Sequence, residues 1–282
     1  MIQPIQLLSG IVLSSLIAAV AYRRQALTGS GAVGAVITGS LIFGFGGWPW
    51  GMLLITFFVL STVLSRYRAG TKEQLAEKFA KGSRRDLGQV LANGGLGTLL
   101  ALAFALFPHS ALLFAFSGAM ATVNADTWAT ELGVLAKRPP RLVTTGRAVE
   151  PGTSGAISLL GTLATLAGGG TIGAAAAVFV LLDGLWWSDV VGPGRAPIGW
   201  LLVATSALGG LAGSLFDSLL GATVQAIYYT RVRNKETERP VDPDGSLNEL
   251  IRGWRWLNND WVNFLSSIVG ALVSAGGFLL LS

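Results

Sequence analysis

The sequence predicts an all-α, polytopic integral membrane protein of about eight transmembrane helices, and three observations support this fold class. Of the 282 residues, 51% are hydrophobic and only 12% are charged, with a mean hydropathy of +0.59, values typical of helical membrane proteins. Apolar runs of helix-spanning length recur, whereas the alternating segments of about ten residues that mark an outer-membrane barrel are absent. The chain has no cysteine and one histidine, His109, which argues against disulfides and a zinc centre.

Eight apolar segments are candidate membrane spans. They lie at about residues 5–22, 30–46, 49–65, 90–107, 110–128, 154–182, 198–229 and 261–281. The first has no basic n-region and no small-residue cleavage pattern, so we expect a retained helix. The second is short and glycine-rich, which leaves open a broken or re-entrant helix. We expect one transmembrane domain over residues 1–282, with polar insertions at 66–88, 134–153 and 230–258.

The distribution of charge predicts the topology. If successive spans alternate in direction, nineteen of the twenty Lys and Arg residues fall on one side and only Arg195 falls on the other. The positive-inside rule makes the basic side cytoplasmic and places both termini outside. This asymmetry accounts for the net charge of +5 without a nucleic-acid partner. We therefore expect a protein of the bacterial inner (plasma) membrane, in contact with membrane lipids, whose site faces the cytoplasm.

Several shorter patterns predict local structure. Tryptophans near outer span ends, such as Trp50, and near inner ends, such as Trp256, are expected to form aromatic belts. Apolar side chains four residues apart predict a short surface helix within 71–81. In the last insertion, residues 242–245 (D-P-D-G) predict a turn, and Ser246 with Glu249 predicts a capping box that opens a helix toward Trp256.

Glycines also carry structural predictions. Gly209 and Gly213, with Gly168 to Gly170 and Gly173, are spaced for close helix packing. Residues 29–34 match the G-x-G-x-x-G string of dinucleotide-binding proteins, but no strand precedes them and no βαβ unit surrounds them. We therefore expect a tight entry into the second span there.

Two aspartates interrupt apolar spans near the same side of the membrane. With a rise of about 1.5 Å per residue, Asp126 lies roughly 24 Å and Asp217 roughly 28 Å along a hydrocarbon core about 30 Å thick. Each is followed by a hydroxyl residue and then a glycine, so two similar acidic sites approach one cytoplasmic-side cavity. Ionisable residues at membrane depth are costly and usually functional. The alternative is that each aspartate pairs with an arginine to hold helix register.

The neighbours of these aspartates favour a metal-phosphate site. Mg²⁺ prefers oxygen ligands and usually takes one or two protein carboxylates plus phosphate oxygens, so its candidate ligands are Asp126, Asp217 and Glu150. Basic side chains suited to phosphate are Lys137, Arg141 and Arg147. Thr153 and Ser154, after Glu150-Pro-Gly152, are expected to begin the sixth span, where helix N-terminal amides would bind an anion. Together these residues predict a site for Mg²⁺ and a phosphorylated ligand.

Further polar residues face the same side. Asp86, Gln89 and Asn93 lie on one helical face at the start of the fourth span, and Asn259, Asn263 and Ser266 do so in the eighth. Interhelical hydrogen bonding explains each stripe as well as ligand contact does. The additional candidate nucleotide or phosphate contacts are Arg85, Asn93, Gln225, Asn259, Asp260 and Asn263.

Five motifs in order carry a resemblance to a known family. They are S-R-Y-R-A-G-T-K, N-A-D-T-W-A-T-E-L-G, E-P-G-T-S-G-A-I-S-x-x-G-T, F-D-S-L-L-G-A-T-V-Q and N-N-D-W-V-N-F. The chain resembles the membrane family that includes the eukaryotic TMEM19-type proteins and the plant chloroplast phytyl-phosphate kinase. It is more remotely similar to dolichol kinase, phytol kinase and phosphatidate cytidylyltransferase, which use CTP. The resemblance implies metal and phosphate roles for Asp126, Glu131, Glu150 and Asp217, whereas Asn258 departs from the expected motif.

The resemblance implies a CTP-dependent kinase that acts with Mg²⁺. Such an enzyme would transfer a γ-phosphate to an isoprenyl monophosphate such as phytyl phosphate and give a diphosphate, as in tocopherol synthesis or phytol salvage. Catalytic roles are expected for Asp126, Glu131 and Asp217. A polyprenol or isoprenol kinase and a cytidylyltransferase-type enzyme are alternatives within the same chemistry. The alternative of another class is a transporter or lipid flippase in which Asp126 and Asp217 couple to protons or cations.

Overall fold

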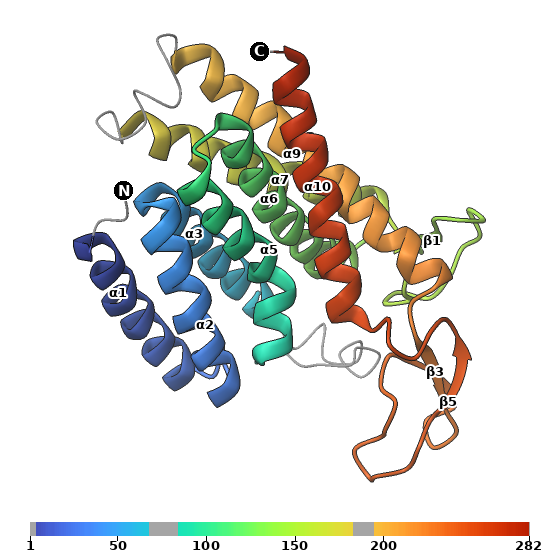
Figure 1. Cartoon of the computed structure of the whole chain (residues 1–282). Helices are drawn as coiled ribbons and strands as arrows, with labels where there is room; N and C mark the ends of the chain where they lie inside the picture. The colour runs from blue at the N-terminus through green and yellow to red at the C-terminus, as the bar shows by residue number, and fades with distance from the viewer. Residues whose placement is uncertain (1–3, 68–83, 183–194, 282) are drawn as a thin grey trace.

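Helices form at each of the apolar runs. The computed structural model describes residues 4–67, 84–182 and 195–281 (Figure 1). Its α-helices are α1 (Pro4–Arg23), α2 (Gly29–Leu41), α3 (Trp48–Arg66), α5 (Leu87–Leu106), α6 (Ser110–Gly133), α7 (Leu159–Leu182), α9 (Arg195–Thr223) and α10 (Asn259–Leu281). The predicted all-α membrane class is confirmed, since seven segments in the described ranges are long and apolar enough to cross a bilayer.

The second span is continuous up to a tight turn. After α2 the chain continues in a π-helical turn, η1 (Ile42–Gly46), and the whole segment Gly29–Gly46 qualifies as a membrane span. The backbone then reverses at Gly47, whose positive φ of 90° favours glycine, and Pro49 lies in the first turn of α3. The glycine-rich composition therefore produces a helix with a wider final turn, followed by a sharp connection.

The helix α6 is the central element of the bundle, although it is not among the seven apolar spans. Its buried residues run without interruption from Leu113 to Ala125, so neighbouring helices surround most of its length. Some of its polar groups bond to these neighbours, although the buried Asn124 Oδ1 has no hydrogen-bond partner among the described residues. Ser117 shares a hydrogen bond of 2.7 Å with Ser206 of α9, and Asn124 Nδ2 donates to the Gly168 carbonyl of α7 over 2.8 Å. Polar residues lower its hydropathy, and they are tolerated because they are buried in protein.

Small residues let α6, α7, α9 and α10 approach closely, as predicted. A Cβ on Gly173 would lie 2.6 Å from the Leu202 carbonyl oxygen, and one on Gly213 would lie 2.9 Å from that of Ser266. Neither distance leaves room for a side chain. The prediction that Trp50 belongs to an interfacial aromatic belt is wrong. Trp50 is fully buried and stacks on Phe116 with ring centroids 4.3 Å apart.

Two small sheets lie at one end of the bundle, and they correct two span boundaries and one helix predicted from sequence. One pairs β1 (Arg141–Leu142) with β2 (Ala156–Ile157); the other has the order β4 (Lys235–Thr237), β3 (Ile227–Thr230), β5 (Glu249–Arg252), all antiparallel. The sixth span therefore begins at Leu159, the seventh ends at Thr223, and the helix predicted after Ser246 is absent. The predicted turn at 242–245 is present, because the Gly245 amide donates to the Asp242 carbonyl over 2.9 Å. Strand pairing with β3 satisfies the β5 backbone, which outweighs the local capping signal.

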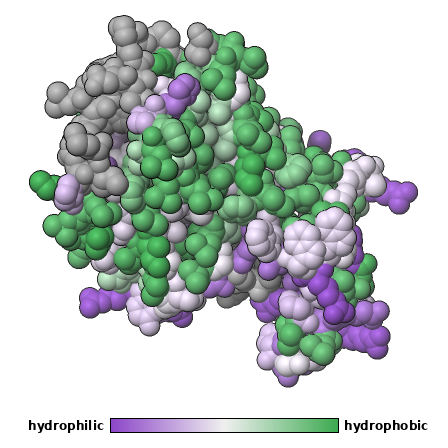
Figure 2. Space-filling view, in the orientation of Figure 1, coloured by the Kyte–Doolittle hydropathy of each residue, from purple (hydrophilic) through white to green (hydrophobic). Residues whose placement is uncertain are grey.

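The two ends of the bundle differ in polarity. Both described chain ends lie at the end opposite β3 and β5 (Figure 1). Apolar residues cover the helical part of the visible face, and hydrophilic residues gather over the strand end (Figure 2). We call this strand-bearing end the polar end; Arg23 and Arg66 close α1 and α3 there, and Arg66 donates to the Arg24 carbonyl over 2.6 Å. Residues 68–83 of the first insertion, with the predicted surface helix within 71–81, lie outside the described residues.

A carboxylate anchors the β3–β4 region and predicts its response to acid. Asp242 is 5% exposed, and it accepts hydrogen bonds from the Thr230 hydroxyl and the Arg233 guanidinium. These bonds, the Thr230 hydroxyl foremost, hold the pKa of Asp242 below its ordinary value. A depressed pKa contributes stability above the unfolded-state pKa of about 4, and this contribution is lost as pH falls through the folded-state value. Acidification should therefore loosen this sheet first.

Hydrogen exchange, corrected for its intrinsic pH dependence, tests this expectation. Between pH 6 and pH 3, the amides of β3 should lose protection while those of α6 keep theirs. In Asp242→Asn the β3 amides should be less protected at pH 6 and should change little on acidification. An unchanged pH dependence in the variant would show that another group controls the sheet.

Candidate functional site

The packing of α6 against α9 brings Asp126 and Asp217 together. Both side chains are half-buried, and the two carboxylates are close enough to interact electrostatically. The helix α10 contributes the buried Ser266, whose hydroxyl donates to Asp217 Oδ2 over 3.3 Å. We call Asp126 and Asp217 the carboxylate pair, to which Ser266 is bonded through Asp217. The arrangement places two like charges at a helix interface, which is unfavourable unless a cation or another positive group compensates them.

A third carboxylate approaches Asp217 from outside the helices. Glu238, just after β4, interacts electrostatically with Asp217. The buried Gln225 holds it, because Gln225 Nε2 donates to Glu238 Oε1 over 2.9 Å while Gln225 Oε1 accepts from the Ser154 hydroxyl over 2.9 Å. Sequence reasoning missed Glu238. It placed Gln225 on a continuation of the seventh span, but Gln225 lies beyond the end of α9.

The segment 150–155 docks on the C-terminal end of α9. A Cβ on Gly155, whose φ is +81°, would lie 2.6 Å from the Ala222 Cα, and one on Gly221 would lie 2.8 Å from the Ser154 hydroxyl. Ser154 is therefore brought within about one helical turn of Asp217. The prediction that Thr153 and Ser154 begin a helix is wrong. Instead, Ser158 caps α7 by accepting from the Gly161 amide over 3.0 Å.

Arg252 is a cation at this site that sequence reasoning also missed. It lies in β5, is half-buried, and donates through Nη2 to the Gly221 carbonyl over 3.0 Å. Its Nε is buried without a hydrogen-bond partner among the described residues. Burial alternates along residues 249–252, which is typical of a strand and places Arg252 toward α9, but this alternation exists only in the folded protein.

The predicted phosphate-binding cations lie in and just before the β1–β2 hairpin. Lys137, Arg141 and Arg147 are exposed, and Arg141 Nη1 donates to the Gly146 carbonyl of its own loop over 2.7 Å. Glu150, Gly152 and Thr153 line a polar pocket of about 380 Å³ together with Glu238 and residues 234–237. In the described part of the chain, no three or more His, Cys, Asp or Glu side chains group closely enough to hold a metal. Glu150 thus lines the polar pocket, and any metal at the pair would rely on two protein carboxylates.

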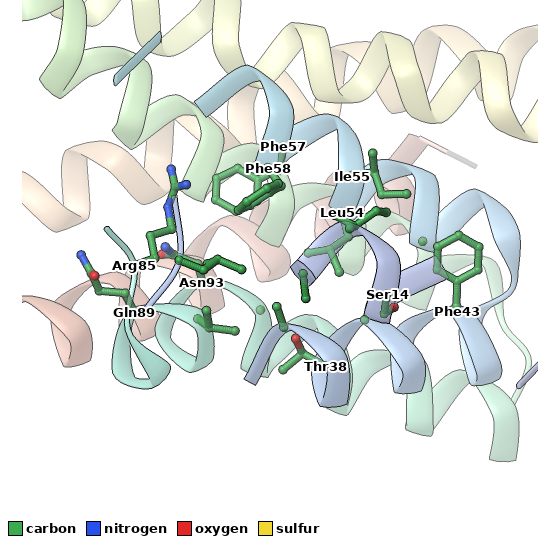
Figure 3. Close-up of a pocket in the computed structure, with 18 residues that line it drawn as sticks. Ser14, Thr38, Phe43, Leu54, Ile55, Phe57, Phe58, Arg85, Gln89 and Asn93 are labelled. Atoms are coloured by element: carbon green, nitrogen blue, oxygen red, sulfur yellow. The ribbon is translucent and has the colours of Figure 1, made fainter. Parts of the chain in front are cut away.

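The fourth-span residues divide into structural and groove-lining groups. Asp86 and Gln89 form a reciprocal capping box at the start of α5, as the Gln89 amide donates to Asp86 Oδ1 over 2.9 Å and the Asp86 amide donates to Gln89 Oε1 over 3.2 Å. Arg85 interacts electrostatically with Glu131 near the end of α6. Arg85, Gln89 and Asn93 also line an apolar groove described below (Figure 3).

At the start of α10, the polar residues have different positions. Asn258 caps the helix by accepting from the Trp261 amide over 3.2 Å. Asn259 and Asp260 are half-buried in the first turn. Asn263 lies one turn before Ser266 on the same face of α10.

Comparison with known proteins identifies the family. Residues 12–271 match the family described as integral membrane protein DUF92. The chain is 34% identical over 284 residues to Protein PGR of Arabidopsis thaliana (96% of this chain, 95% of that protein) and 30% identical over 269 residues to the uncharacterized membrane protein MJ0933 of Methanocaldococcus jannaschii (95% and 93%).

A more distant relative and the search of solved structures complete the comparison. Protein VTE6, chloroplastic, of Arabidopsis thaliana is 25% identical over 254 residues, which cover 88% of this chain and 64% of that protein. No solved structure matches. These relatives confirm the membrane family indicated by the five motifs. The chain therefore belongs to the integral membrane protein family DUF92.

Proposed function

We propose that this protein is a membrane-embedded phosphotransferase that uses Mg²⁺ and a nucleoside triphosphate, CTP by family resemblance, to phosphorylate an isoprenyl monophosphate. The observation that carries the proposal is the meeting of Asp126 and Asp217 at the interface of α6 and α9, toward the polar end of the bundle. The chloroplast relative VTE6 and the resemblance to lipid kinases support an acceptor of the isoprenoid class.

The donor atoms of the pair fit a hard divalent cation. Asp126 and Asp217 would hold Mg²⁺, which commonly takes one or two protein carboxylates and completes its shell with water and phosphate oxygens. When bound, the ion would neutralise charge on the nucleotide phosphates. A bound cation would offset the like charges of the pair, and Ser266 orients the Asp217 carboxylate by its hydrogen bond.

The polar pocket suits the nucleoside part of the donor. Its lining includes Glu150, Glu236 and Glu238, which are unfavourable for a bare phosphate but can accept hydrogen bonds from ribose hydroxyls and from the amino group of a base. Ser154 and Glu238 belong both to this pocket and to the network that reaches Asp217. We therefore place the nucleoside in the polar pocket and its triphosphate toward the carboxylate pair, with Arg252 nearby.

The proposed reaction requires positioning more than covalent catalysis. An oxygen of the acceptor phosphate attacks the γ-phosphorus, the bond from that phosphorus to the β–γ bridging oxygen breaks, and the nucleoside diphosphate leaves with the electron pair. The acceptor oxygen is already anionic, so it needs no histidine base. The site accordingly supplies charge compensation and alignment.

A direct activity assay tests the proposed function and its alternatives. Purified protein is incubated with CTP, Mg²⁺ and geranylgeranyl or phytyl monophosphate, and products are identified by mass spectrometry; we expect the isoprenyl diphosphate and CDP. Phosphorylation of the free prenol instead would indicate an isoprenol kinase, and release of pyrophosphate with a CDP-lipid would indicate a cytidylyltransferase. Absence of product with every acceptor and nucleotide would refute the proposal.

A transporter is disfavoured by the depth of the pair. Asp126 lies seven residues before the end of α6 at Gly133, about 10 Å along the helix axis, whereas alternating access places a site near the bilayer midplane. Cation- or proton-dependent flux of lipid in proteoliposomes, without phosphorylation, would reverse this preference.

Replacing Gln225 should weaken nucleotide binding more than the chemical step. Gln225→Ala removes the two bonds that hold Ser154 and Glu238 between the polar pocket and Asp217. We expect the KM for CTP to rise about 10-fold, the size of effect typical of groups behind a metal or phosphate site, with a smaller change in kcat. Thr223→Ala is a matched control, since Thr223 is exposed and its hydroxyl donates to the Leu219 carbonyl of its own helix. Equal effects of the two substitutions on KM would exclude the positioning role.

A further inference from the structure

A long apolar groove lies between the first helices and ends in polar side chains. It is bounded by α1, α2, α3 and α5, with Ala18, Ala35, Leu54 and Phe58 among its walls. Figure 3 shows Arg85, Gln89 and Asn93 together at one end and Phe43 at the other. The groove has a cavity volume of about 80 Å³ and is open along one side. It forms because α3 packs mainly on α6 and α7, away from α1 and α2.

The groove runs along the bundle. Along α2 and η1, its lining extends from Ala35 to Phe43, and Leu27 and Arg85 lie at the polar end, where α2 and α5 begin. From Leu27 to Phe43 the chain rises by about 24 Å at roughly 1.5 Å per residue. This is most of a hydrocarbon core of about 30 Å. The walls are therefore suited to an extended apolar chain that lies parallel to the helices.

Arg85 gives the polar end a held positive charge. Its guanidinium donates to the hydroxyls of Ser61 over 3.0 Å and Thr62 over 3.1 Å, and lies 5.5 Å from the Phe58 ring centroid. Its backbone is fixed as well, since its amide donates to the Ala26 carbonyl over 3.0 Å. An anion at the groove end would find a positioned guanidinium.

The groove end lies at the same end of the bundle as the carboxylate pair. Arg85 interacts electrostatically with Glu131, and Asp126 lies five residues earlier on α6, about 8 Å along the helix axis. A phosphate beside Arg85 would thus lie toward the same end of α6 as Asp126, offset from it by about 8 Å along the axis. The apolar length, the cation at one end only and this proximity together favour a single-chain anionic lipid over a neutral or two-chain lipid.

We propose that this groove binds the isoprenyl chain of the monophosphate acceptor, with Arg85 holding its phosphate. This inference rests on the proposed function for the identity of the acceptor. It assigns that acceptor a binding site which is separate from the polar pocket of the nucleotide. The two substrates would then approach the carboxylate pair from different sides.

Photo-cross-linking locates the acceptor directly. Protein in nanodiscs is irradiated with geranylgeranyl monophosphate that carries a diazirine on its chain, and labelled peptides are mapped by mass spectrometry. We expect labels on α2, α3 and α5 at groove-lining residues, with competition by unlabelled geranylgeranyl monophosphate but less by a fatty-acyl phosphate. Labelling spread over the outward faces of α1 and α10, with no competition, would overturn the proposal.

Matched variants separate chain binding from phosphate binding. Ala35→Phe fills the groove and should reduce labelling about 10-fold, whereas Val33→Phe, on the exposed face of the same helix, should not. Arg85→Gln should reduce labelling by the geranylgeranyl monophosphate probe but not by the corresponding prenol probe. Arg84→Gln removes a neighbouring, exposed positive charge that does not line the groove and serves as its control. Equal effects within either pair of variants would contradict the assignment.

The same experiment separates failure of the groove from failure of the kinase proposal. Asp126→Asn should keep groove labelling while it loses phosphotransfer. If the groove of wild-type protein is labelled specifically but no diphosphate forms, the lipid site is supported and the proposed reaction is refuted. If diphosphate forms but the labels lie outside the groove, the proposed reaction is supported and the groove is refuted as the lipid site.

Discussion

Asp126→Asn and Asp217→Asn are each expected to reduce kcat/KM for phosphotransfer by about 100-fold or more. Groups that merely orient metal ligands are commonly worth 10–100-fold, and these carboxylates would bind the ion themselves. Because the two act on one ion, the double variant should be little worse than either single variant. The measurement is the initial rate of isoprenyl diphosphate formation at varied Mg²⁺.

Stability measurements give this prediction a second readout. Replacing one carboxylate by an amide removes the repulsion between Asp126 and Asp217, so the metal-free variants should unfold at the same or a higher temperature than wild type. Wild-type protein should be stabilised by Mg²⁺ with nucleotide, and the variants should lose this shift because they bind the ion weakly.

Asp244→Asn is the matched control for the carboxylate-to-amide change. Asp244 lies in an exposed turn, where it accepts from the Ser246 hydroxyl over 2.7 Å and from the Ser246 amide over 3.0 Å. Its replacement should leave both activity and the Mg²⁺ shift near wild type. If Asp126→Asn kept full activity, the carboxylate pair would have a purely structural role and the proposed site would be wrong.

Gly270→Val is expected to destabilise the bundle by about 3 kcal/mol or more. Gly270 of α10 lies where α6, α9 and α10 meet, and an added Cβ would lie 2.9 Å from both the Gly118 and the Gly209 carbonyl oxygens. These atoms belong to helix backbones, so relief requires the helices to separate, and overpacking of this kind costs typically 1–3 kcal/mol and occasionally more. Separation would also displace Ser266, one turn earlier on α10, from Asp217.

The same helix offers a control for this substitution. A Cβ on Gly276 would have no atom within 4 Å, so Gly276→Val adds the same side chain to α10 without a clash. We expect a lowered unfolding temperature in detergent and a loss of activity for Gly270→Val, with little change for Gly276→Val. Similar behaviour of the two variants would mean that helix propensity, rather than close packing, explains the effect.

Local patterns in the sequence were sufficient for most of the helical fold. Apolar runs predict the spans because a helix in a bilayer satisfies its own backbone, so its position depends on neighbouring residues alone. The same locality locates Asp126 and Asp217, since charge at membrane depth is conspicuous in any apolar run. The close helix contacts at Gly173 and Gly213 followed from residue size in the same way.

The exceptions are segments in which distant partners compete with local preference. Ser246 and Glu249 carry a helix-capping signal, yet residues 249–252 pair with β3, because a strand forms only when its partner is present. Trp50 resembles an interfacial tryptophan by position, but it packs on Phe116 of the central helix. In both cases the deciding contact joins residues that are far apart in the chain.

The sequence by itself thus determined the membrane class, the helices, the basic end and the two aspartates. Only the tertiary structure brought Glu238, Ser266 and Arg252 to these aspartates and opened the groove beside Arg85. The physical reason is that hydropathy and helical period act over a few adjacent residues, whereas a site depends on which helix faces meet. That choice is made by close packing and hydrogen bonding between segments more than a hundred residues apart, such as α6 and α10.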